Sequence, residues 1–178
     1  MSRRSFLLLL CAAAAAAKTP RPAVSVPIRG SDGKPIELRK FRGRTVLLMI
    51  FSTQCDDCIR MLDIVNRIQK DLGPKGLQVI GAAGDPNAKY MLPIFVQRYR
   101  PAFPIGFIEK EAIIKVADVP EGMRPVVPIL LFIDRWGMVR EQYYGDHPVV
   151  KNGEPAIRAL ANAMLGVTPV GTQQAASK

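Results

Sequence analysis

The feature that most constrains this chain is an apolar segment that ends three residues before a close pair of cysteines. Residues 45–52 read Thr-Val-Leu-Leu-Met-Ile-Phe-Ser, a continuous run typical of a strand that is buried on both faces of a sheet. After Cys55 and Cys58, apolar residues recur at helical spacing until Gly73-Pro74 ends the pattern. The sequence therefore predicts a buried strand that leads into a helix, with both cysteines at the junction.

The remaining elements complete an α/β pattern. A strand–helix–strand order implies parallel pairing through a right-handed crossover, and the tight hairpin Arg135-Trp136-Gly137 adds antiparallel strands. Pro93 weakens one helix, and Pro101 with Pro104 favours extended chain after it. We expect a mixed sheet with helices on its faces, built from an N-terminal β-hairpin at 24–28 and 35–38, strands at 45–52, 77–82, 129–134 and 138–144, and helices at 56–72, 87–100, 111–117 and 154–165.

The first 17 residues have the composition of an export signal. Arg3 and Arg4 precede an apolar run of about a dozen residues and a stretch of small residues, the pattern of a cleavable signal peptide. The run is shorter than the roughly 20 residues that span a bilayer. The start Ser-Arg-Arg-Ser-Phe-Leu also resembles a twin-arginine signal. A lipid anchor on Cys11 is disfavoured, because Leu10 stands where a small residue would be needed.

These segments divide the chain into three parts. We expect a signal peptide at 1–17, one domain at 18–165 and a disordered tail at 166–178, where the residues are small and polar. The protein would then be periplasmic or otherwise extracytoplasmic. A chain of 178 residues with 48% hydrophobic and 22% charged residues is long and apolar enough for one buried core.

The charge of the chain does not indicate a nucleic-acid partner. The formal net charge is +10, but the basic residues are scattered in short runs such as 39–44 and 98–100. A nucleic-acid binder would need a basic face with stacking aromatic residues, and these runs do not form one.

The cysteine count points to redox chemistry. Of three cysteines, Cys11 is lost with the signal peptide, which leaves Cys55 and Cys58. In an oxidising compartment such a pair can form a disulfide, but the loop that it closes is too short to add much stability. At a helix N-terminus, unpaired backbone N–H groups and the helix dipole stabilise a thiolate. One sulfur would be exposed and activated, and the other could attack a mixed disulfide.

The order of these motifs resembles the thioredoxin superfamily, in particular its exported TlpA/ResA-like branch. The resemblance covers residues 24–165 and rests on the segments 30–38, 41–48, 55–58, 80–85 and 127–137. It implies a thioredoxin-like fold with an N-terminal β-hairpin and a thiol–disulfide oxidoreductase without a cofactor. It further implies that Cys55 attacks, that Cys58 resolves, and that Pro128 is a cis-proline beside them. Substrate would contact Val127, Pro128 and Gln54.

The sequence departs from that family in the surroundings of the cysteines. Gln54 replaces the usual tryptophan, and Met49 and Met61 stand where relatives carry an acidic residue. Asp56 and Asp57 separate the cysteines, and their charges should disfavour the Cys55 thiolate while the helix terminus favours it. Weaker stabilisation of the thiolate makes the dithiol a better reductant, so we expect a reductase rather than a strong oxidant.

Three other interpretations use the same residues. Two thiolates suffice for copper(I), so a copper-delivery protein is the main alternative; no further metal site is expected, because His147 is the only histidine. Peroxide reduction is disfavoured, because Thr53 lies one position too close to Cys55 for the peroxidase pattern. A redox-inactive binding module is the third. As an oxidoreductase, the protein would be a monomer whose partners are client thiols or disulfides and a membrane thiol electron donor.

Overall fold

The predicted buried strand forms the centre of the sheet. In the computed structural model, which describes residues 19–166, β4 (Thr45–Phe51) pairs in parallel with β5 (Leu77–Ala83) and antiparallel with β7 (Ile129–Ile133). Its side chains alternate between two apolar clusters, one on each face of the sheet: Leu47, Met49 and Phe51 on one, and Val46, Leu48 and Ile50 on the other. This alternation explains why the segment is apolar throughout.

Within residues 19–166 the sheet has eight strands and is mixed, as predicted. The parallel strands β4, β5 and β6 (Ile105–Phe107) lie next to one another, and the other neighbouring pairs are antiparallel. In spatial order the strands are β1 (Arg21–Pro22), β8 (Met138–Tyr143), β7, β4, β5, β6, β2 (Ile28–Gly30) and β3 (Pro35–Ile36).

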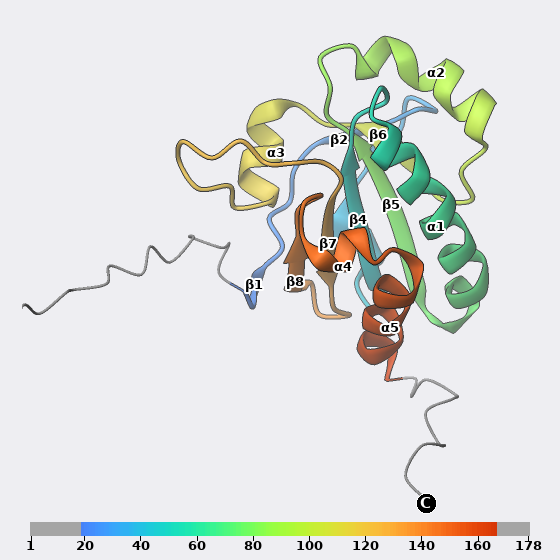
Figure 1. Ribbon diagram of the computed structural model, residues 1–178, viewed down its shortest axis with the longest axis vertical. Helices are drawn as coiled ribbons and strands as arrows, with labels where there is room; N and C mark the ends of the chain where they lie inside the picture. Colours follow the sequence, from blue (N-terminus) through green and yellow to red (C-terminus); the bar gives the residue numbers. More distant parts are fainter. Residues whose placement is uncertain (1–18, 167–178) are drawn as a thin grey trace, which may run out of the picture.

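Helices cover both faces of the sheet (Figure 1). One face is covered by α1 (Asp56–Leu72), α2 (Ala88–Tyr99), the short α4 (Pro148–Lys151) and α5 (Glu154–Leu165). The other face is covered by α3 (Lys110–Val116) and the 3₁₀ helix η1 (Leu38–Phe41); a second 3₁₀ helix, η2 (Gly73–Lys75), follows α1. The predicted α/β class is therefore confirmed.

Helix α1 begins directly after Cys55. Its buried residues, which are Cys58, Met61, Leu62, Val65, Ile68 and Leu72, recur at the spacing of one helical face. Asp56 and Asp57 occupy the first turn, where carboxylates interact favourably with the helix dipole. Gly76, with φ of +106°, lets the chain turn back into β5. The apolar face of α1 fixes both cysteines relative to the sheet.

The N-terminal hairpin is shifted from its predicted position. Its strands are 28–30 and 35–36 rather than 24–28 and 35–38, and Leu38 begins η1 instead of ending a strand. The earlier residues cannot extend β2, because the chain first pairs with β8 through β1 and then crosses to the opposite edge of the sheet. During this crossing Val26 is buried in the apolar cluster on the α3 side.

Proline 93 lies inside α2 without ending it. The helix spans Ala88–Tyr99, close to the prediction, and Ala88, Leu92 and Phe95 are buried against the core. This packing on both sides of Pro93 offsets the missing backbone donor.

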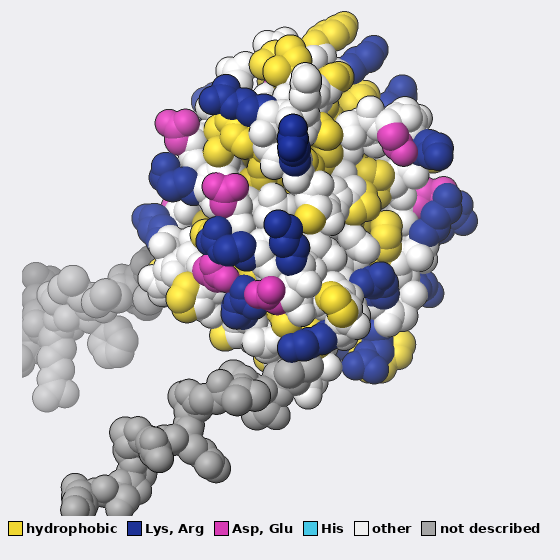
Figure 2. Space-filling model, turned by 90° about the vertical axis from the view of Figure 1, so that its right-hand side faces the viewer, with side chains coloured by type: hydrophobic (Ala, Val, Ile, Leu, Met, Phe, Trp, Pro, Cys, Tyr) yellow, Lys and Arg dark blue, Asp and Glu magenta, His cyan; other side chains and the backbone are white. Residues whose placement is uncertain are grey.

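The surface on the side of α1 and α2 mixes charged and apolar groups. Figure 2 shows lysine and arginine side chains distributed over this face among hydrophobic and acidic ones, without a continuous basic track. Among residues 19–166, no helix combines the length and apolar character needed to cross a membrane. The predicted signal peptide and all but the first residue of the predicted tail lie outside the described residues.

Candidate active site

Cys55 is the N-cap residue of α1. Its backbone is extended, with φ of −100° and ψ of 117°, and its Sγ accepts a hydrogen bond from the backbone N–H of Cys58 at 3.3 Å. The sulfur thus takes the position of a capping oxygen and satisfies one of the free N–H groups of the first turn. Cys55 is half-buried, so a reaction partner can approach it. This environment stabilises negative charge on sulfur.

Cys58 has the opposite surroundings. It is fully buried among the apolar side chains between α1 and the sheet, and both cysteines are free thiols. Burial raises the pKa of the Cys58 thiol, and a hydrogen bond with Cys55 and the charge of Asp85 raise it further. A backbone hydrogen bond with Ser52 acts in the other direction. Cys58 is therefore protonated at neutral pH and buried, whereas Cys55 is half-exposed.

The other predicted residues of this turn are exposed. Gln54, Asp56 and Asp57 all face solvent, beside Cys55 in the sequence. Asp57 forms an ion pair with Arg60 one turn along the helix. Because this pairing screens one of the two carboxylates, Asp56 has the less compensated charge.

A contact that the sequence did not predict holds the turn before Cys55. The Asp85 carboxylate accepts the backbone N–H of Thr53 at 2.7 Å and the Thr53 hydroxyl at 3.0 Å. Phe51 of β4 pairs with Ala83 of β5, so the residues that follow the two strands meet at one edge of the sheet. The sequence does contain one signal for this contact: Asp85 lies two residues after the parallel strand β5. Ligand and catalytic groups gather at the carboxyl ends of such strands.

The predicted substrate residues lie beside the same turn. Ile129 pairs with Ile50, which places Val127 and Pro128 next to the end of β4. The Val127–Pro128 peptide bond is cis, Pro128 is buried, and Val127 packs against the apolar cluster that also contacts Cys55. The structure thus brings the cysteines and the 127–128 segment to one end of the sheet.

Gly145, which follows β8, allows the chain to pack closely against the 127–128 segment. Gly145 donates its backbone N–H to the carbonyl of Val126 at 2.8 Å. A Cβ atom at Gly145 would overlap the carbonyl of Val127, and the backbone N of Pro128 would be 3.2 Å away. Only glycine lets the two backbones approach so closely. The sequence offered no signal for this requirement, because the two segments are far apart along the chain.

A cavity of about 750 Å³ opens next to this end of the sheet. Its walls include Ser52, Asp85 and Val127, together with apolar side chains of α3 and of the following loop such as Ile113, Ile114 and Met123. The cavity is large enough for several side chains of a bound segment and is mainly apolar with a few polar groups.

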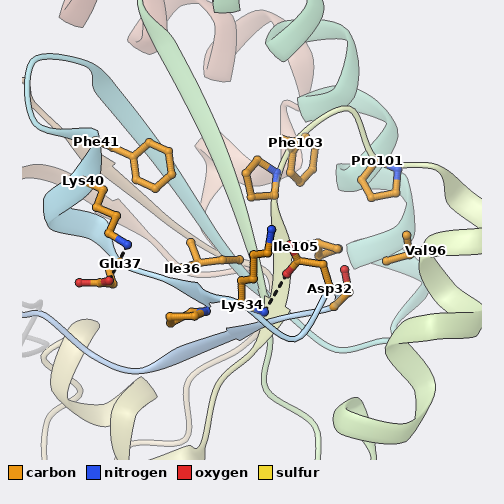
Figure 3. Close-up of a pocket in the computed structure, with 13 residues that line it drawn as sticks. Asp32, Lys34, Ile36, Glu37, Lys40, Phe41, Val96, Pro101, Phe103 and Ile105 are labelled. Atoms are coloured by element: carbon orange, nitrogen blue, oxygen red, sulfur yellow. Dashed lines mark hydrogen bonds and ion pairs between the residues drawn. The ribbon is translucent and has the colours of Figure 1, made fainter.

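A second cavity, of about 390 Å³, lies at the edge of the sheet that β2 and β3 form (Figure 3). Two of its acidic groups are already engaged: Asp32 accepts the backbone N–H of Lys34 at 3.0 Å, and Glu37 pairs with Lys40 at 2.7 Å. It is lined by the N-terminal hairpin and the 101–105 segment, and neither of the two cysteines in the described residues, Cys55 and Cys58, lines it.

The described part of the chain does not assemble a larger metal site. Within residues 19–166, no three His, Cys, Asp or Glu side chains come together. His147 caps α4, where its Nδ1 accepts the backbone N–H of Val149 at 3.1 Å. A metal at the cysteines would therefore have two thiolates as its protein ligands, a set that suits copper(I) rather than zinc.

Comparison with known proteins agrees with this geometry. The sequence profile of the AhpC/TSA family matches residues 17–142, most of the chain. The chain belongs to the AhpC/TSA family. The match includes the buried strand, both cysteines and the segment with Pro128.

The individual relatives compared with this chain are described as thiol-disulfide oxidoreductases. The chain is 29% identical over 115 residues to "Thiol-disulfide oxidoreductase ResA" of Bacillus thuringiensis subsp. konkukian, covering 65% of this chain and 63% of that protein. It is 28% identical over 130 residues to a protein of the same description from Halalkalibacterium halodurans, covering 72% of this chain and 70% of that protein. The first match thus spans slightly less than two thirds of the relative.

Solved structures show the same fold. A putative thiol:disulfide interchange protein DsbE from Chlorobium tepidum superposes with a TM-score of 0.72 at 22% identity, covering 85% of this chain and all of that one. A putative protein disulfide isomerase from Bacteroides thetaiotaomicron has a TM-score of 0.66 at 18% identity, covering 84% and 91%. This AhpC/TSA-family chain therefore has the predicted thioredoxin-like fold.

Proposed function

We propose that this protein is an exported thiol–disulfide oxidoreductase that reduces disulfides in client proteins through a Cys55–Cys58 dithiol/disulfide cycle. The observation that carries the proposal is the unequal pair itself. A half-exposed sulfur caps α1 and accepts the backbone N–H of Cys58 at 3.3 Å, and the thiol of Cys58 itself is buried with a raised pKa. Thiol–disulfide exchange requires one attacking and one resolving sulfur in this arrangement. The descriptions of the ResA relatives support the same activity.

The first step is attack by Cys55. As a thiolate, its Sγ forms a bond with one sulfur of the client disulfide, and the client S–S bond breaks. The other client sulfur leaves as a thiolate and takes up a proton. The product is a mixed disulfide between Cys55 and the client.

The second step uses Cys58. Its thiol loses a proton and attacks Sγ of Cys55, which breaks the mixed disulfide and releases the second client sulfur as a thiolate that is then protonated. A Cys55–Cys58 disulfide remains, and two electrons and two protons have passed to the client. Reduction by a membrane thiol donor would restore the dithiol for the next cycle.

Client binding would use the segment beside the cysteines. Backbone groups of Val127, before Pro128, would pair with an extended client strand, and exposed Gln54 would contact the client from the other side of Cys55. The apolar cavity next to Val127 would accept client side chains. Clients would thus be recognised mainly by an accessible disulfide in an extended segment, by a protein acting as a monomer.

The N-terminal pattern of residues 1–17 supports export, and the acidic turn supports reduction rather than oxidation. The less compensated charge of Asp56 would disfavour a thiolate at Cys55 and so make the dithiol a better electron donor.

The proposal is tested by client reduction with single cysteine variants. The full chain carrying Cys11→Ser has Cys55 and Cys58 as its only thiols. We expect it, once reduced, to reduce a disulfide-bonded model peptide, whereas Cys55→Ser abolishes the reaction. Cys58→Ser should stop at a stable mixed disulfide, visible as an added peptide mass on Cys55.

Other results would favour the alternatives. If neither variant changes a slow background rate and no mixed disulfide forms, the oxidoreductase proposal fails. Copper(I) titration of the same protein then separates the rest: binding of one ion that both cysteine variants lose would indicate copper delivery, and no binding would indicate a redox-inactive module.

A further inference from the structure

Both oxygens of the Asp85 carboxylate accept hydrogen bonds from Thr53, in the turn before Cys55. One oxygen accepts the backbone N–H of Thr53 at 2.7 Å, and the other accepts its hydroxyl at 3.0 Å. Thr53 is buried and lies between the end of β4 and Cys55. Hydrogen bonds to a charged acceptor in such a place are among the stronger ones in proteins. Asp85 therefore fixes both the backbone and the side chain of Thr53.

The turn that Asp85 fixes contacts both cysteines. The carbonyl of Ser52 accepts the backbone N–H of Cys55 at 3.3 Å, and the backbone of Ser52 acts to lower the pKa of the Cys58 thiol, against the effect of burial. Next to Asp85, Gly84 donates its N–H to the carbonyl of Phe51 at 2.8 Å. A shift of Thr53 would move Ser52 and thereby change the surroundings of both sulfurs.

Asp85 also supplies negative charge close to the inner sulfur. Its charge adds to burial in raising the pKa of the Cys58 thiol. Met49 and Met61 pack in the same apolar cluster as Cys58 and supply no charge. Asp85 lines the cavity of about 750 Å³ and also a neighbouring cavity of about 500 Å³. The other charged side chains that line these two cavities are Lys89 of α2, Glu109, Lys110 and Glu111 at the start of α3, and Glu121 and Arg124 of the following loop.

We propose that Asp85 is a positioning residue of the Cys55–Cys58 site, which acts through Thr53 on the turn before Cys55 and places a negative charge beside Cys58. The inference rests on the proposed dithiol chemistry. Its consequence is an order of reaction: Cys58 stays a thiol while Cys55 attacks, and the fixed turn keeps the two sulfurs aligned for the second step.

The test uses the full chain carrying Cys11→Ser and measures two rates against pH: alkylation of the half-exposed Cys55, and attack of the buried Cys58 on a mixed disulfide formed at Cys55 with dithionitrobenzoate. Asp85→Asn removes the charge but keeps an oxygen for the Thr53 N–H. Thr53→Val removes the hydroxyl bond and keeps the charge. Asp32→Asn is the matched control, because Asp32 also accepts a backbone N–H, in the turn between β2 and β3.

Asp85→Asn should move the pH profile of the attack by Cys58 toward lower pH, because it removes a charge that raises the pKa of the Cys58 thiol. Thr53→Val should leave the pH dependence in place, yet slow resolution of the mixed disulfide about threefold to tenfold. Thr53→Ser, which keeps the hydroxyl, should restore most of the rate. Combining Asp85→Asn with Thr53→Val should slow resolution less than the product of the two separate effects.

The inference is overturned if Asp85→Asn leaves the Cys58 profile where Asp32→Asn leaves it, or if Thr53→Val resolves the mixed disulfide at the wild-type rate. Should Asp85→Asn not fold, Thr53→Val and Thr53→Ser decide, and equal rates for the two overturn it. The small disulfide reagent takes the place of the client, so a failure of client reduction alone is distinguishable from a failure of this inference.

Discussion

Two cysteines three residues apart have different chemical environments in this protein. Cys55 is half-exposed at the N-cap, and Cys58 is fully buried with a raised pKa. The difference comes from the helix, because the N-cap lies outside the first turn while the residue three further on faces the core. The roles proposed for the two sulfurs, attack and resolution, follow from this difference in exposure.

Substitution of Gly145 should destabilise the folded protein. Gly145→Ala places a methyl group against the carbonyl of Val127, a backbone atom that no side-chain rotation can move away. We expect the free energy of unfolding to fall by about 1–3 kcal/mol, measured by urea denaturation, and client reduction to fall with it, because the overlap displaces the segment beside the cysteines.

Gly122→Ala serves as the control in the neighbouring loop. No atom lies within 4 Å of the added Cβ there, so its positive φ of +77° is the source of any cost, about 1 kcal/mol. A Gly145→Ala protein with wild-type stability and activity would show that this close approach does not matter.

The sequence alone predicts which two cysteines would react, but it does not predict the contacts that hold them in place. Cys55 and Cys58 are visible because their spacing and the adjacent strand and helix are local features. The bonds between Asp85 and Thr53, and the contact of Gly145 with Val127, join segments far apart in the chain. Such pairs depend on strand register, which a single sequence does not specify.

At the scale of elements, the N-terminus of α1 combines two opposing electrostatic effects. Free N–H groups and the helix dipole favour a thiolate at Cys55, whereas Asp56 and Asp57 oppose it. The same carboxylates stabilise the helix. When these carboxylates are removed, the reactivity of Cys55 should therefore rise and the stability of the helix should fall.

Substitution of these two residues should separate the effects. Asp56→Asn should raise the alkylation rate of Cys55 at pH 7 about two- to fivefold, while lowering the free energy of unfolding by about 0.3–1 kcal/mol. Asp57→Asn should raise the rate less, because Arg60 already pairs with that carboxylate. Iodoacetamide kinetics and urea denaturation measure the two quantities.

Asp63→Asn, on the exposed side of α1 beyond its first turn, is the matched control and should leave the alkylation rate unchanged. Equal alkylation rates for Asp56→Asn, Asp63→Asn and the unsubstituted chain would contradict the claim that the acidic turn lowers the reactivity of Cys55 and thereby favours reduction.

Elements with strong local patterns were predicted well, and those defined by pairing were not. The apolar runs of β4 and β5 and the amphipathic face of α1 are visible in the sequence. Strands β1 and β6 are two and three residues long, and each exists because a neighbouring strand offers it hydrogen bonds. The shift of the N-terminal hairpin has the same origin.

At the scale of the whole molecule, the sheet brings three distant segments to one end. The parallel register of β4 and β5 places Asp85 beside Thr53, and the antiparallel register of β4 and β7 places Pro128 beside the same turn. The cysteine pair, its support and the proposed client-binding segment thus lie together because of strand order.

The most direct test of this account is the midpoint potential of the Cys55–Cys58 pair. The full chain carrying Cys11→Ser would be equilibrated in dithiothreitol and glutathione buffers and quenched by thiol alkylation. Protein dithiols range from about −270 mV for a reductant to about −120 mV for a strong oxidant. The account predicts a value toward the negative end of this range. A value near −120 mV, or no disulfide in any buffer, would contradict it.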